Sequence, residues 1–297
     1  MVSKKIIFSI IGVVLVLTAV TAVVAVNFLP DSSTGTVGEV SIQGSIMPST
    51  GSGMFGDQAV TPRGFRSTVD RALSSGVDGL LVKINSPGGS VVASKDVARV
   101  ISDTDVPVVC QLKDSAVSGA YWVATECDKV VADSVSMTGS IGVTSAYLEF
   151  SGLMEEYGVE FVNLSSGDHK FTGSPFQELG DEERKMLEEQ LETVHEEFKE
   201  QIMDSRNLTR DEVEGVSTGR TFLGSEAVEK GLIDVTGSRR DSLEILENKT
   251  NKSLEVESFD RRDSFNILSL LVESLGEGIG STLSFESVPE TSHPEIR

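Results

Sequence analysis

The chain has few of the residues that build metal sites and disulfide scaffolds. Its 297 residues include two cysteines and three histidines, whereas a structural zinc site uses about four Cys or His ligands and a disulfide framework needs several cysteine pairs. We expect no metal ion, and no motif calls for another cofactor. Cys110 ends an apolar run typical of an interior strand, so we expect Cys110 and Cys127 to be buried free thiols rather than a disulfide.

Basic residues are also scarce. Lys and Arg total 25 against 46 Asp and Glu, which gives a net charge of −21. A surface this acidic repels phosphate backbones, so nucleic-acid binding is excluded. Hydrophobic residues make up 39% and charged residues 24% of the chain, values typical of a folded protein rather than a disordered or collagen-like one.

The N-terminus carries the one long hydrophobic run. Residues 6–29 are uncharged and almost wholly apolar, and a helix of that length would reach about 36 Å, enough to cross a ~30 Å hydrocarbon core. Lys4 and Lys5 precede the run and Asp31 follows it, so the positive-inside rule places residues 1–5 in the cytoplasm and everything after Pro30 outside. A cleaved signal peptide usually has a shorter apolar region, of ~7–15 residues, and no convincing cleavage site follows here, so we favour an uncleaved anchor in the cell membrane.

Beyond a polar linker at residues 30–36, short apolar runs alternate with amphipathic stretches. A first strand is expected around Val40, Ile42 and Ile46, and further strands and helices are expected at the following positions. The strands are 79–84, 106–112, 129–132, 141–146 and 159–164; the helices are 94–102, 119–125 and 181–206. This alternation predicts an α/β fold with a largely parallel sheet. We place the folded domain at 37–240 and a C-terminal extension, partly helical with a disordered tail, at 241–297.

Three strand exits carry residues suited to chemistry, and functional loops of such sheets lie at these exits. The first is Ser86–Gly89, whose paired glycines can turn N–H groups toward a developing negative charge. The second is Ser118 followed by Gly119, where a serine precedes a short helix. The third is Lys170, in the Gly-rich loop 165–176; a neutral lysine can remove the proton of a serine hydroxyl. Taken singly, each has an ordinary explanation as a turn, a helix N-cap or a solvated lysine.

Taken together, the motifs resemble the signal peptide peptidase A family of membrane-anchored Ser/Lys peptidases, which have the Clp/crotonase fold of repeated β-β-α units. They occur in the order typical of that family and cover about residues 37 to 240. The matching segments are SPGG at 86–89, SGAYW at 118–122, TGSIGV at 138–143, SGDHK at 166–170, GSPF at 173–176 and GRTFLGSEAVEKGLID at 219–234. Ala120 departs from the second glycine that many members have after the nucleophile, but alanine is still small.

The resemblance implies a role for each site residue. Ser118 would be the nucleophile and Lys170 the general base, Ser140 would orient the lysine, and the N–H groups of Gly89 and Gly119 would form the oxyanion hole. It also implies a ring-like homo-oligomer in which Ser118 and Lys170 meet across a subunit boundary. The substrates would be peptides, such as remnant signal peptides or other unfolded apolar segments at the membrane.

Several alternatives remain open. His169 and Asp168 could form a triad with Ser118, although adjacent residues tend to point in different directions and so do not easily form a relay. The peptidase could instead process a stomatin-like membrane partner. A non-catalytic membrane scaffold, or an acyl-CoA enzyme of the same fold, fits the motifs less well.

Overall fold

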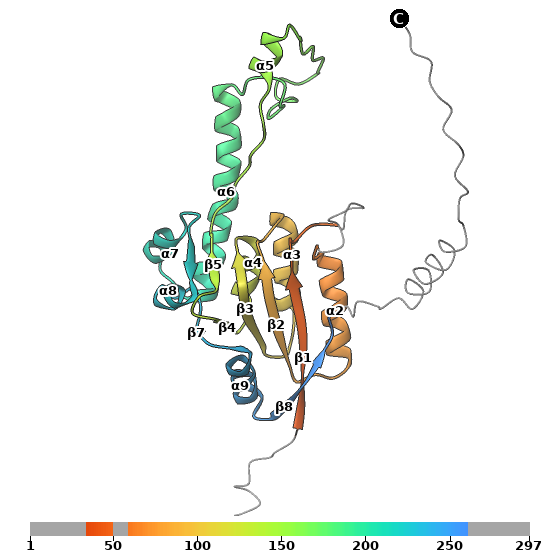
Figure 1. The fold of residues 1–297 in the computed structure, drawn as a ribbon, viewed down its shortest axis with the longest axis vertical. Coiled ribbons are helices and arrows are strands. Elements are labelled where there is room, and N and C mark those ends of the chain that lie inside the picture. Colours follow the sequence, from red (N-terminus) through yellow and green to blue (C-terminus); the bar gives the residue numbers. More distant parts are fainter. Residues whose placement is uncertain (1–33, 50–58, 261–297) are drawn as a thin grey trace, which may run out of the picture. The chain divides into compact units, whose positions relative to one another are not determined.

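The computed structural model describes residues 34–49 and 59–260 (Figure 1). The chain divides into two units, 1–259 and 260–297, and all the described helices and strands belong to the first. The predicted membrane span at 6–29 and nearly all of the C-terminal stretch beyond 259 lie outside the described residues. Among the residues described, no helix is long and apolar enough to cross a bilayer.

The core of the fold is one eight-stranded sheet in which every pairing is parallel except that of β5 with β6. The strand order is β6-β5-β3-β2-β1-β8, with β4 also paired to β3 and β7 paired to β4. The prediction of a largely parallel sheet is confirmed. The strands are β1 (Thr34–Gln43), β2 (Gly79–Ser86), β3 (Val108–Val117), β4 (Lys129–Ala132), β5 (Met137–Gly139), β6 (Thr221–Leu223), β7 (Val235–Thr236) and β8 (Ser253–Ser258).

Helices cover both faces of this sheet, as expected where parallel strands are buried on two sides. One face packs on α2, α3 and α4 through the main core cluster, and α9 packs on the other face through a smaller cluster that includes Leu81 and Leu246 (Figure 1). The helices are α2 (Pro62–Ser74), α3 (Val91–Ser102), α4 (Gly119–Thr125), α5 (Ser151–Glu156), α6 (Asp181–Arg206), α7 (Arg210–Val216), α8 (Gly224–Glu229) and α9 (Arg239–Thr250). The predicted bounds of α4 and α6 agree with the structure, and α3 begins three residues earlier than predicted.

The described helices and strands extend beyond 37–240 on both sides, from Thr34 to Ser258. Strand β1 begins at Thr34, inside the expected linker, because Thr34 pairs with Ser253 of β8. The predicted boundary at 240 falls within α9, which covers the sheet. Helix α9 is hard to predict from the sequence, because only Ser242 and Leu246 of it are buried and it therefore has no long apolar stripe. The remainder of the extension, 261–297, lies outside the described residues.

The strands predicted at 141–146 and 159–164 are absent from the structure. The second run is apolar but exposed, and Leu164 keeps 91% of its surface accessible. Its segment lies with α5 beyond the N-terminal end of α6, away from the sheet (Figure 1). The apolar run at 159–164 suggested a buried strand, but in the described part of the chain no neighbouring strand pairs with it.

The prediction of two free thiols is wrong, because Cys110 and Cys127 form a disulfide. Cys110 lies in β3, and Cys127 follows α4 just before β4. Since β4 pairs with β3 so that Val130 lies opposite Cys110, the chain returning from α4 brings Cys127 to the same place. The loop closed by the disulfide contains Ser118.

Candidate active site

Ser118 lies at the junction of β3 and α4, half-buried. Its backbone has φ 55° and ψ −129°, and few non-glycine residues have positive φ. Its N–H donates to the carbonyl of Gly139 at 2.8 Å. Ser118 stands at the N-cap position of α4, yet its side chain makes no capping hydrogen bond, which leaves the hydroxyl available. Strain of this kind gathers at functional sites.

The loop of Gly88 and Gly89 packs beside the N-terminal end of α4. Ile46 donates to the carbonyl of Gly88 at 2.8 Å and accepts from the N–H of Ser90 at 2.9 Å, so the N–H of Gly89, between them, points away from Ile46. A Cβ on Gly88 would lie 2.7 Å from the nitrogen of Gly119, which only glycine permits. The N–H groups of Gly89 and Gly119 make no hydrogen bond within the described part of the chain, and such a pair can bind an oxyanion.

Ser140 follows β5 and lies in the same region as Ser118. The carbonyl of Gly139, the preceding residue, accepts from the N–H of Ser118. The N–H of Ser140 donates to the carbonyl of Arg220 at 2.8 Å. Ser140 also has a positive φ of 52°. The structure therefore brings Ser118, Ser140, Gly89 and Gly119 together at one end of the parallel strands.

Lys170 is not part of this group within one chain. It is exposed, and its N–H donates to the carbonyl of Gly167 at 3.2 Å. Its segment packs on itself through Phe161, whose ring lies 5.7 Å from that of Phe171. The segment also contacts α6, because Thr172 donates to Glu183 at 2.8 Å. Helix α6 is 26 residues long, or about 39 Å, and the segment lies beyond its N-terminal end (Figure 1).

Asp168 and His169 lie in the same turn as Lys170. Both are exposed in the same turn, and no hydrogen bond or ion pair links them to the residues around Ser118. The structure does not assemble the alternative triad within one chain.

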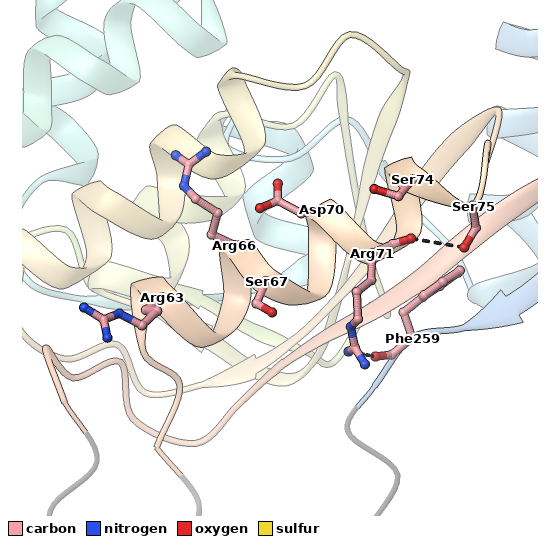
Figure 2. Close-up of a pocket in the computed structure, with 8 residues that line it drawn as sticks. All are labelled: Arg63, Arg66, Ser67, Asp70, Arg71, Ser74, Ser75 and Phe259. Carbon is pink, nitrogen blue, oxygen red and sulfur yellow. Dashed lines mark hydrogen bonds between the residues drawn. The ribbon is translucent and has the colours of Figure 1, made fainter.

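A groove of about 700 Å³ lies along the outer face of α2 (Figure 2). Arg71 donates to the carbonyl of Phe259 at 2.9 Å, and Arg66 pairs with Asp103 at 3.0 Å. The groove is lined by Arg63, Arg66, Ser67, Asp70, Arg71, Ser74, Ser75 and Phe259, none of them a predicted site residue. It is therefore separate from the candidate active site. Within the described residues, no group of three or more His, Cys, Asp or Glu side chains could hold a metal ion.

Comparisons with known proteins show the family of the chain. The model of peptidase family S49 matches residues 101–253, a range that includes Ser118, Ser140 and Lys170. A protein of Methanocaldococcus jannaschii named as a putative protease is 30% identical over 240 residues, which are 78% of this chain and 77% of that protein. A protein of Enterococcus faecium named as a putative signal peptide peptidase is 31% identical over 215 residues, 71% of this chain and 62% of the relative.

A solved structure of similar fold is a mutant of the 1510-N membrane-bound stomatin-specific protease in complex with a substrate peptide. Its TM-score is 0.51 at 12% identity, and the match covers 81% of this chain and 99% of that one. At this identity the match shows likeness of fold. The family match over half of the chain and the relative at 30% identity show more: the chain belongs to peptidase family S49 and is a serine peptidase.

Proposed function

We propose that this peptidase is a membrane-anchored endopeptidase that uses a Ser118–Lys170 dyad to degrade remnant signal peptides or other unfolded apolar peptides at the membrane. The observation that carries the proposal is the geometry at Ser118. A half-exposed serine in a strained conformation, without a capping role, lies beside two unpaired N–H groups. The anchor predicted at 6–29 would hold the catalytic domain outside the cell, at the membrane surface.

The reaction follows from the assigned groups. The Ser118 Oγ attacks the carbonyl carbon of the peptide while Lys170 Nζ takes its proton. The N–H groups of Gly89 and Gly119 donate to the negative oxygen that develops. When the tetrahedral intermediate collapses, the leaving amine takes the proton from Lys170, and an acyl ester remains on Ser118. Lys170 then activates a water molecule that hydrolyses the ester, and Ser140 orients the lysine.

A second copy of the chain would supply the lysine. Within one chain Lys170 lies on the segment beyond α6, whereas Ser118 lies at the sheet. The Lys170 segment also exposes large apolar side chains: Leu148 is 73%, Tyr157 75% and Leu164 91% exposed. A neighbouring subunit that covered these side chains could receive Lys170 at its own Ser118, as expected for a head-to-tail ring.

The dyad can be tested with an alkyl fluorophosphonate, which phosphonylates activated serine hydroxyls with loss of fluoride, on the full-length protein in detergent. We expect labelling of the wild type, its loss in Ser118→Ala, and its retention in the matched variant Ser115→Ala, three residues earlier on β3. Lys170→Ala should also abolish labelling, whereas His169→Ala should retain it. If His169→Ala loses labelling and Lys170→Ala keeps it, the triad replaces the dyad. If the wild type is not labelled, the proposal that Ser118 is an activated nucleophile is refuted.

The substrate class needs a separate measurement. Signal peptides released in vesicles should be cut into fragments by the wild type and left intact by Ser118→Ala. Cleavage of a whole stomatin-like membrane protein at one position, with signal peptides untouched, would favour the alternative role. Peptide mapping by mass spectrometry separates the two results.

A further inference from the structure

The hydroxyl of Ser86 is buried and holds the loop that carries Gly89. Ser86 is the last residue of β2, and only 1% of its surface is exposed. Its Oγ accepts a hydrogen bond from the N–H of Gly88 at 3.1 Å. The reaction proposed for Ser118 does not use this hydroxyl, so the hydrogen bond needs an explanation of its own.

The backbone of Ser86 is fixed to the strand that leads to the nucleophile. Ser86 pairs with Ala116 of β3, two residues before Ser118. The pairing of β2 with β3 shifts its register just before this point, and there the N–H of Ser115 donates to Oδ1 of Asn85 at 3.2 Å. The loop therefore leaves the sheet from a residue that is itself held beside the active site.

One peptide unit joins the carbonyl of Gly88 to the N–H of Gly89, and its orientation decides where that N–H points. The two groups of a trans peptide point in opposite directions. Since the carbonyl of Gly88 accepts from the N–H of Ile46 at 2.8 Å, the N–H of Gly89 points to the opposite side. A flip of this peptide unit would turn the N–H of Gly89 away from the oxyanion hole.

Two hydrogen bonds, one on each side of Gly88, oppose such a flip. Ile46 holds the carbonyl of Gly88, and Ser86 Oγ holds its N–H. Gly88 has φ 90°, and glycine by itself moves readily between such conformations and others. The backbone of Gly88 therefore keeps its conformation through these contacts and not through a preference of its own.

We propose that Ser86 is a positioning residue of the oxyanion hole. Through the N–H of Gly88 it holds the next peptide unit in the orientation that directs the N–H of Gly89 at the developing negative oxygen. A donor held in place beforehand need not reorient when the charge develops, so the effect falls on the transition state and not on the bound substrate. The proposal rests on the proposed function, since it needs Ser118 as the nucleophile and Gly89 as a donor.

The test measures hydrolysis of a fluorogenic peptide by the full-length protein in detergent, with active sites counted from the end point of fluorophosphonate labelling. For Ser86→Ala we expect kcat per labelled site to fall about tenfold, less than for the loss of a direct oxyanion donor, with KM within about twofold of the wild type. Ser86→Cys fills the position with a weak acceptor and should behave in the same way.

The matched control is Ser242→Ala in α9. Ser242 is also a fully buried serine, and its hydroxyl donates to the carbonyl of Ser238 at 3.1 Å. Loss of one buried hydrogen bond should lower the midpoint of thermal unfolding by about 2–4 °C in Ser242→Ala and Ser86→Ala alike. Only Ser86→Ala should lower kcat per labelled site.

A peptide aldehyde reports on the oxyanion hole directly. The Ser118 hydroxyl adds across the aldehyde carbonyl to form a hemiacetal, whose oxygen occupies the place of the oxyanion. The inhibition constant of the aldehyde should therefore rise in Ser86→Ala by about the factor by which kcat falls. A merely structural role would reduce the number of labelled sites but leave kcat per site and the inhibition constant unchanged.

Two results would overturn the proposal. One is a kcat per labelled site for Ser86→Ala equal to that of the wild type. The other is recovery of kcat in Ser86→Cys, which would make Ser86 a spacer; Ser86→Cys also carries the test if Ser86→Ala does not fold. Ser118→Ala, run in parallel, separates these results from failure of the proposed function. If Ser118→Ala keeps its activity, the nucleophile is wrong, whereas a Ser118-dependent activity that does not change with Ser86 refutes only the role of Ser86.

Discussion

Ser118 and Ser140 share an uncommon backbone conformation, with φ of 55° and 52°. Positive φ costs a non-glycine residue of order 1–3 kcal/mol, and the surrounding structure must impose it. Here the hydrogen bonds from Ser118 to Gly139 and from Ser140 to Arg220 fix both residues. The strained backbone of Ser118 thus sets the orientation of the nucleophile's side chain.

Gly89 offers a test of the oxyanion hole at this scale. Gly89→Ala would place a Cβ 1.9 Å from the carbonyl oxygen of Ile46, so the loop must shift and its N–H must leave the hole. We expect kcat/KM to fall by about 10²-fold or more, measured with a fluorogenic peptide. Gly215→Ala is the control, because a Cβ there meets nothing within 4 Å. It should keep full activity, and equal losses in both variants would contradict this role of Gly89.

At the scale of elements, Asp234 joins the end of α6 to the sheet. Its carboxylate accepts from Lys129 at 2.8 Å, from the N–H of Val130 at 2.8 Å and from Arg206 at 2.9 Å. The side chain of Arg206 is only 8% exposed. Asp234→Asn would leave this guanidinium buried beside a neutral amide. We expect the free energy of unfolding in urea to fall by about 3 kcal/mol.

The matched control is Asp103→Asn. Asp103 pairs with Arg66, but both side chains are largely exposed, so the loss should be within about 1 kcal/mol. If the two variants lose the same stability, Asp234 does not anchor α6 in the way described.

The same carboxylate predicts a dependence of stability on pH. Burial raises the pKa of Asp234, but hydrogen bonds from Lys129 and Val130 and the charge of Arg206 outweigh it and hold the pKa below its usual range. A lowered pKa in the folded state stabilises the protein above the unfolded pKa, ~3.9, and this stabilisation is lost as the pH falls through the folded pKa. Below pH ~4, the free energy of unfolding measured in urea should therefore fall more steeply with decreasing pH for the wild type than for Asp234→Asn. The same decrease in the free energy of unfolding below pH ~4 in both proteins would contradict the prediction.

In the whole molecule, the proposed site is divided between two separate parts of the fold. Ser118, Ser140 and the two oxyanion-hole glycines lie at the sheet, whereas Lys170 lies on the segment beyond the N-terminal end of α6. Mixing Ser118→Ala with Lys170→Ala subunits should restore partial activity, because one kind of boundary then joins an intact serine to an intact lysine. The measurement is peptide hydrolysis after joint refolding of the two variants. Mixtures that stay inactive would show that each site is completed within one chain.

The exposed apolar side chains of the lysine segment give a second test at this scale. Leu164→Glu places a charge where we expect a neighbouring subunit, and it should convert the oligomer to smaller species and abolish activity with little change in stability. Val135→Glu is the control, since Val135 is also exposed, at 70%, but lies outside that segment. Sedimentation in detergent reports the oligomeric state. An unchanged oligomer in Leu164→Glu would place the interface elsewhere.

Local features of the chain could be predicted from its sequence. The amphipathic pattern of α6 predicted its bounds correctly, although the structure fully buries only Phe198, Lys199 and Ile202 of it, and ordered motifs were sufficient to indicate the peptidase family and its candidate residues. Features that depend on contacts between distant parts of the chain are visible in the folded structure alone. β8 joins the sheet beside β1, Cys127 returns to Cys110, and the apolar run at 159–164 has no strand to pair with. Only the fold also revealed the hydrogen bond from the N–H of Gly88 to the buried hydroxyl of Ser86. The reason is physical: a residue's own pattern sets its local conformation, whereas pairing, burial and close approach are set by neighbours that lie far away in the sequence.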